Sequence, residues 1–178
     1  LAQVLMGVRR SRKSTLCYNV LKQHAEKFAY VNFDDERFDG LQTSDLNTVL
    51  EVLYKIYGDF KYLFLDEIQN IDGWHLFVNR LLRQRMHILV TGSNAKLLSG
   101  ELATHLTGRN EQIELYPFSF AEYCHCNGVD TKSKTTKAEA LRRAAFDDYL
   151  KQGGFPELLH KENKTRYVGT LVNNILKR

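Results

Sequence analysis

The stretch Gly7-Val8-Arg9-Arg10-Ser11-Arg12-Lys13-Ser14-Thr15 decides the fold. It follows a short apolar run, Gln3 to Met6, that is typical of a buried strand, and it precedes Leu16 to Lys27, which can form a helix. Strand, loop, Lys-Ser and helix is the layout of a phosphate-binding P-loop, in which backbone N–H groups and the helix N-terminus face an anion. The pattern predicts that Lys13 binds the β- and γ-phosphates of a nucleotide and that the Ser14 hydroxyl binds Mg²⁺.

One position of this loop departs from the usual spacing G-x-x-x-x-G-K-[ST], because Arg12 stands where the second glycine belongs. On the loop alone, a basic helix start that binds no ligand is an equal alternative. If the loop requires φ > 0 at Arg12, the side chain costs about 1–2 kcal/mol, although its guanidinium could also contact a phosphate. We expect weak ATP binding that Arg12→Gly tightens. The candidate nucleotide-binding residues are Gly7, Arg10, Ser11, Arg12, Lys13, Ser14 and Thr15.

A second stretch, Tyr62 to Leu65, consists of four large apolar residues and predicts a strand buried on both faces. Asp66 and Glu67 follow it directly. Two carboxylates at the end of a buried strand are costly unless a cation meets them, and Mg²⁺ bound to a nucleotide is such a cation. We expect Asp66 to orient Mg²⁺ and Glu67 to polarise the attacking water, the alternative being an acidic turn after a core strand.

Two further polar residues are candidates for catalysis. Asn94 follows the predicted strand His87 to Thr91, where it could contact the γ-phosphate or the attacking water, or could cap the next helix. Arg109 lies between a helix and a strand, either as a surface residue or as an arginine finger that reaches a nucleotide on the adjacent subunit. The finger would require a homo-oligomer.

Composition sets the class of protein. The 178 residues, 43% hydrophobic and 26% charged, suffice for one domain with a small appendage. The net charge of +4 tolerates an anionic partner without itself indicating nucleic acid. There is no membrane span or signal sequence, and three cysteines without metal-site spacing fit a reduced, cytoplasmic chain. Because the chain starts with Leu1, we expect it to be a piece of a longer protein.

Strands that alternate with helices predict a three-layer α/β fold with a mainly parallel, five-stranded sheet. We place this P-loop core at residues 1–116. From Pro117 the pattern becomes helical, with capping boxes at Ser119–Glu122 and Thr136–Glu139, and we expect residues 117–178 to form a small helical lid or connector.

The motif set is more specific than the strand pattern. The sequences GVRRSRKST, YLFLDEIQN, VTGSNAKLL, HLTGR and GGFPE occur in this order. Together they resemble the bacterial and archaeal AAA+-like ATPases that carry a C-terminal domain of unknown function. The resemblance runs from Gln3 to about Asn174.

The resemblance implies ATP as ligand on a five-stranded P-loop sheet. It implies Walker A roles for Lys13 and Ser14, Walker B roles for Asp66 and Glu67, a sensor role for Asn94 and a finger role for Arg109. It also implies that a short N-terminal segment and a C-terminal domain are absent. Two alternatives to an Mg²⁺-dependent ATPase stay open: a nucleotide-responsive binding module with little hydrolysis, and an ATPase subunit associated with DNA.

Overall fold

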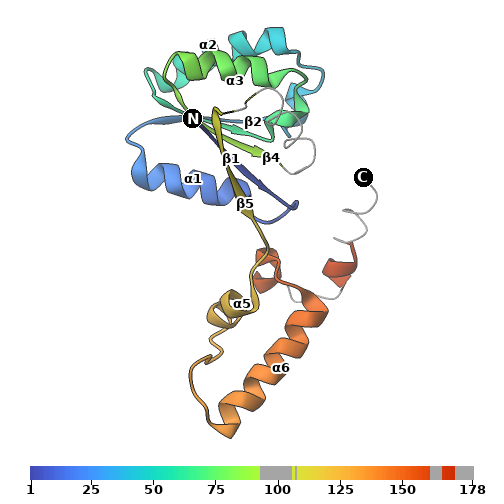
Figure 1. The fold of residues 1–178 in the computed structure, drawn as a ribbon. Coiled ribbons are helices and arrows are strands. Elements are labelled where there is room, and N and C mark those ends of the chain that lie inside the picture. The colour runs from blue at the N-terminus through green and yellow to red at the C-terminus, as the bar shows by residue number, and fades with distance from the viewer. Residues whose placement is uncertain (93–105, 107, 161–165, 171–178) are drawn as a thin grey trace. The chain divides into compact units, whose positions relative to one another are not determined.

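The computed structural model describes residues 1–92, 106, 108–160 and 166–170 (Figure 1). Contacts between Cα atoms divide the chain into two compact units. The first comprises Leu1–Val8 and Arg12–Leu115, and the second comprises Arg9–Ser11 and Tyr116–Arg178. Three residues of the loop after the first strand therefore group with the second unit.

The first unit is built on a five-stranded sheet whose strands are all parallel. The strand order is β2-β3-β4-β1-β5. This confirms the α/β class and the five-stranded parallel sheet expected from the sequence. The strands are β1 (Ala2–Gly7), β2 (Phe28–Asn32), β3 (Tyr62–Asp66), β4 (His87–Gly92) and β5 (Asn110–Leu115).

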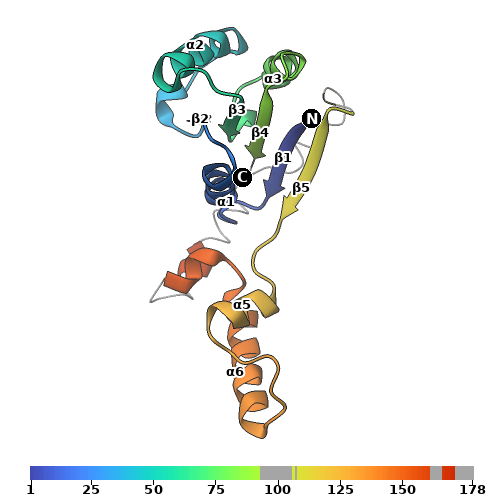
Figure 2. The same cartoon turned by 90° about the vertical axis from the view of Figure 1, so that its left-hand side faces the viewer.

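Helices cover both faces of this sheet (Figures 1 and 2). On one face lies α1 (Lys13–His24), whose Cys17 and Leu21 pack against Leu5 and Phe64 of the strands. On the other face lie α2 (Leu46–Tyr57) and α3 (Trp74–Arg83), which form the larger core with alternate residues of the same strands. Because successive residues of a strand point to opposite faces, β1 and β3 are buried on both sides.

The sheet order brings three strand ends together at one edge. Strands β1 and β3 flank β4, and all three run in the same direction. Their carboxyl ends therefore deliver Gly7, Asp66 and Gly92 to the same edge, which is where open α/β sheets bind ligands.

The second unit contains α5 (Phe120–Cys126), α6 (Thr136–Gln152) and a 3₁₀ turn at Pro156–His160. The predicted capping box at Ser119 and Glu122 is present, with both reciprocal hydrogen bonds. The box predicted at Thr136 is wrong by one residue: Thr135 caps α6, and its hydroxyl accepts from the N–H of Ala138. Thr135 and Thr136 can both cap a helix, so local sequence did not distinguish them.

No helix within the described ranges is long and apolar enough to cross a membrane. The three cysteines are free thiols, with Cys17 and Cys124 buried and Cys126 exposed. Burial, and then the negative charge of Asp66, raise the pKa of the Cys17 thiol to about 12. Cys17 is therefore an inert core residue at neutral pH.

Candidate functional site

The loop between β1 and α1 places a buried lysine at a helix start. Lys13 is the first residue of α1, and only 4% of it is exposed. Its ammonium donates to the carbonyl oxygens of Gly7 and Val8, each at 3.1 Å. The side chain thus lies against the loop and adds positive charge near the helix N-terminus, where an anion is favoured.

Two arginines of the loop have a left-handed backbone. Arg10 has φ 67°, and Arg12, the N-cap of α1, has φ 65° and ψ 29°. The side chain of Arg12 is exposed and does not cap the helix. Left-handed residues in such turns occur in backbone nests, which point N–H groups at an anion. Arg12 therefore has the positive φ at which we expect an arginine to be strained.

Asp66 is the centre of a hydroxyl cluster at the carboxyl end of β3. Its carboxylate is almost fully buried, with 3% of the residue exposed. Oδ1 accepts from the Ser14 hydroxyl at 2.8 Å and from the Thr91 hydroxyl, and Oδ2 accepts from the Tyr30 hydroxyl at 3.1 Å. Four elements, α1, β2, β3 and β4, therefore meet at one carboxylate.

The negative charge of Asp66 affects the pKa of the neighbouring Tyr30. Burial, and then the charge and hydrogen bond of Asp66, raise the pKa of the Tyr30 phenol. Tyr30 therefore stays protonated and remains a donor throughout the neutral pH range. Three hydroxyl groups therefore donate hydrogen bonds to the buried Asp66 carboxylate. A carboxylate is tolerated in a protein interior only when it has such partners.

Glu67 lies next to Asp66 in a left-handed conformation, with φ 53° and ψ 38°. Its backbone N–H donates to the Thr91 hydroxyl at 3.2 Å, and its side chain is half-buried. The carboxylate oxygen Oε2 accepts from Nε2 of Gln69 at 2.6 Å. The two predicted carboxylates thus have different partners, since Asp66 accepts from the Ser14 hydroxyl and Glu67 accepts from the Gln69 amide.

The other predicted site residues are not all brought to this point. Ser11 is buried with no partner for its hydroxyl among the described residues, and Thr15 is exposed. Within the second unit, Arg10 donates to the Tyr167 hydroxyl at 2.7 Å. The predicted sensor, Asn94, lies outside the described residues.

Arg109 directly precedes β5, at the amino-terminal ends of the strands, whereas Asp66 lies at their carboxyl ends. Its carbonyl accepts from the N–H of Ala2 at the start of β1, and its guanidinium donates to Asn79 of α3 at 3.3 Å. With about 3.3 Å per residue, the length of β1 separates it from Gly7 by roughly 16 Å. Arg109 is therefore not part of the cluster around Asp66 in its own chain.

The donor set around Asp66 fits Mg²⁺. The Ser14 hydroxyl and the Asp66 carboxylate supply hard oxygen ligands that lie within 2.8 Å of each other. In the part of the chain that the structure describes, no group of three His, Cys, Asp or Glu side chains could hold a metal. This suits Mg²⁺, which usually binds one or two protein oxygens and completes its shell with phosphates and water.

Sequence reasoning missed Tyr30 and Thr91, which supply two of the three donors to Asp66. Thr91 carried a signal, because it is the last residue but one of β4, and the carboxyl ends of parallel strands meet on one side of the sheet. Tyr30 lies inside β2, two residues before the end of that strand, and carried no such signal.

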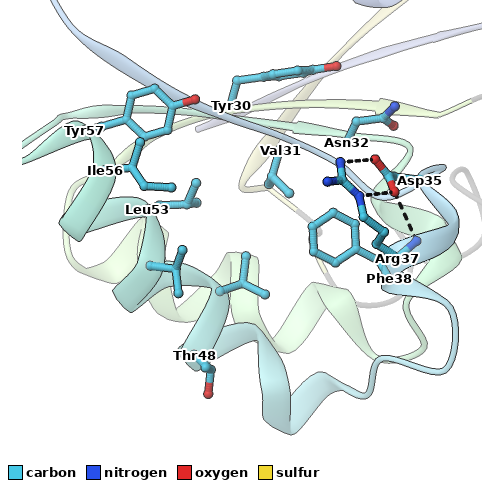
Figure 3. A pocket seen from close by; sticks show the side chains of 12 residues that line it. Tyr30, Val31, Asn32, Asp35, Arg37, Phe38, Thr48, Leu53, Ile56 and Tyr57 are labelled. Atoms are coloured by element: carbon cyan, nitrogen blue, oxygen red, sulfur yellow. Dashed lines mark hydrogen bonds and ion pairs between the residues drawn. The ribbon is translucent and has the colours of Figure 1, made fainter.

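A pocket of about 400 Å³ lies between β2 and α2 (Figure 3). Its lining is mostly apolar and includes Val31, Leu53 and Ile56, with the ion pair of Asp35 and Arg37 at its edge. The hydrogen bonds from Arg37 lower the pKa of Asp35 to about 2. Tyr30, whose hydroxyl donates to Asp66, is one of the lining residues, so the pocket adjoins the cluster around Asp66, although Asp66 and the loop after β1 do not line it.

Comparisons with known proteins agree with the fold. A family model described as an AAA domain matches residues 1–124. An uncharacterized protein of Methanocaldococcus jannaschii is 38% identical over 160 residues, which cover 88% of this chain and 36% of that protein. An uncharacterized protein of Haemophilus influenzae is 36% identical over 165 residues, which cover 88% of this chain and 40% of that protein. The chain therefore spans less than half the length of these relatives.

Proposed function

Because the chain belongs to the AAA domain family of P-loop ATPases, we propose that it binds ATP at the loop after β1 and hydrolyses it with Mg²⁺. The observation that carries this proposal is the hydrogen bond from Ser14 to the buried carboxylate of Asp66. It joins the residue after the loop lysine to the carboxyl end of β3, and in P-loop sites this hydroxyl is the Mg²⁺ ligand.

Each residue has a distinct role in the proposed reaction. Lys13 binds the β- and γ-phosphates, and Ser14 and Asp66 hold Mg²⁺, which when bound neutralises charge on the phosphate oxygens. Glu67 orients a water molecule in line with the γ-phosphorus. The water oxygen bonds to phosphorus as the bond to the β-phosphate oxygen breaks, and the products are ADP and inorganic phosphate.

Steady-state phosphate release from ATP tests this proposal. We expect release that depends on Mg²⁺ and saturates with ATP. A wild-type chain that binds ATP but releases no phosphate above the rate of the buffer would instead be a nucleotide-responsive binding module. The left-handed Arg12 is the observation that favours this second candidate, because a side chain at this position can keep the backbone from approaching the phosphates.

The substitution Arg12→Gly tests the role of this arginine. Since Arg12 has φ 65° in the folded chain, this strain lowers the stability of the fold, and we expect Arg12→Gly to raise the free energy of unfolding by about 1–2 kcal/mol. We also expect tighter ATP binding, because glycine lets the backbone approach the phosphates. Thermal unfolding and ATP titration measure the two effects.

A control substitution distinguishes the relief of backbone strain from an effect on ATP binding. Arg85 also has positive φ, at 62°, but lies just after α3. Arg85→Gly should raise stability in the same way and leave ATP affinity unchanged. Weaker ATP binding by Arg12→Gly than by the wild type would mean that the Arg12 guanidinium is a phosphate ligand.

Arg109 can act on ATP only across a subunit interface, because the sheet separates it from the loop of its own chain. If it is a finger in trans, turnover per subunit rises with protein concentration, and Arg109→Ala flattens that rise. Such fingers are worth about 10³–10⁵ in rate in GTPases, so a much weaker version is measurable. Arg83→Ala, an exposed arginine on α3, is the control. Turnover that is independent of concentration and of Arg109 would make this residue structural.

A further inference from the structure

The turn after β3 carries two amide side chains with different acceptors. Both belong to the 3₁₀ turn Ile68–Asn70. Nδ2 of Asn70 donates to the main-chain carbonyl of Phe33 at 3.1 Å, which ties the turn to the end of β2. Nε2 of Gln69 donates to the Glu67 carboxylate at 2.6 Å. Asn70 therefore anchors the turn, whereas Gln69 contacts the carboxylate proposed to orient water.

The backbone brings these two side chains together. Glu67 is left-handed, its N–H is held by the Thr91 hydroxyl, and the 3₁₀ turn begins at the next residue. This reversal lets residues 67 and 69 meet, although residues two apart on a helix do not face each other. The left-handed conformation of a non-glycine residue is costly, and such outliers cluster at functional sites.

The orientation of the Gln69 amide follows from electrostatics. If the amide were flipped, its carbonyl oxygen would face the Glu67 carboxylate and repel it. With Nε2 toward Glu67, the oxygen Oε1 is buried without a hydrogen-bond partner among the described residues. The turn therefore leaves a buried acceptor unsatisfied while it keeps a donor on Glu67, so the contact with Glu67 dominates the placement of Gln69.

We propose that Gln69 is a positioning residue for ATP hydrolysis, which fixes the rotation of the Glu67 carboxylate so that it can orient the attacking water. This inference rests on the proposed ATPase function. A charge-assisted hydrogen bond of 2.6 Å holds one carboxylate oxygen and thereby sets the plane of the group. Gln69 itself need not touch ATP, so its removal should affect turnover and not binding.

The substitution Gln69→Met, which keeps the length of the side chain and removes the amide, tests this role. We expect kcat to fall by about 10- to 100-fold, since small misplacements of a catalytic group can cost about 100-fold. The affinity for ATP and Mg²⁺ should stay at the wild-type value. Gln69→Ala, which cannot overfill the turn, should give the same loss. Gln84→Met, at an exposed glutamine just after α3, is the matched control and should leave kcat unchanged.

A double-mutant cycle with Glu67→Gln distinguishes positioning from general damage. If Gln69 acts through Glu67, Gln69→Met has no further effect on single-turnover hydrolysis in the Glu67→Gln background. Losses that multiply, or a kcat of Gln69→Met equal to or above that of the wild type, would overturn the inference. A wild-type chain without ATP turnover would overturn the proposed function and this inference together, whereas an active wild type with an indifferent Gln69 overturns only the inference.

Discussion

Lys13→Ala is expected to weaken ATP binding by about 30- to 5,000-fold, which corresponds to a loss of about 2–5 kcal/mol. The ammonium is nearly buried and already lies against the loop, 3.1 Å from the carbonyls of Gly7 and Val8. Truncating it removes the one side chain at the standard phosphate-lysine position, and no other residue of α1 replaces it there. Titration of ATP into both proteins measures the effect.

The control for Lys13 lies on the same helix. Lys22 is exposed near the end of α1, so Lys22→Ala changes the net charge equally and should bind ATP as the wild type does. Circular dichroism checks that Lys13→Ala keeps the fold. Equal ATP affinity of the wild type and of folded Lys13→Ala would refute the phosphate assignment.

Glu67→Gln is expected to keep ATP binding and to lower turnover by about 10²–10⁴-fold, the usual contribution of a general base. The amide has nearly the same shape as the carboxylate, and its oxygen can still accept from Gln69, so the turn should persist. Only the ability to polarise water is lost. Phosphate release at saturating ATP measures the change.

An exposed glutamate provides the comparison for Glu67. Glu51 lies on α2, where its carboxylate accepts from the Asn47 amide at 2.9 Å. Glu51→Gln should hydrolyse ATP at the wild-type rate. If Glu67→Gln also did so, Glu67 would be a turn residue, which is the alternative that the sequence left open.

The proximity of Ser14 to Asp66 could be predicted from the sequence. Both residues belong to contiguous motifs, each consisting of a buried strand followed by polar residues. Because parallel strands end at a common edge, two such motifs meet there whatever the details of packing. The all-parallel sheet follows from the same alternation of strands and helices.

The hydroxyls of Tyr30 and Thr91 could not be placed with the same certainty, because their positions depend on register. Asn32 pairs with Asp66 across β2 and β3, and Leu65 pairs with Val90 across β3 and β4. A shift of one residue would turn each side chain to the other face of the sheet. Register is set by packing of the whole core, which no single motif contains.

The backbone conformation at Arg12 and Glu67 could not be predicted from the sequence either. The sequence left open whether Arg12 has positive φ, since residues other than glycine usually avoid this conformation. The structure has φ 65° at Arg12 and φ 53° at Glu67, both beside the hydroxyl cluster. Tertiary contacts, such as that of the Glu67 N–H with Thr91, stabilise a conformation that local preference opposes.

Isothermal titration of ATP into the wild-type chain, with and without Mg²⁺, tests the central claim most directly. We expect one ATP per chain and tighter binding with Mg²⁺, because Ser14 and Asp66 would hold the ion and its charge would offset that of the phosphates. Absence of ATP binding under both conditions, or an affinity that Mg²⁺ leaves unchanged, would contradict it.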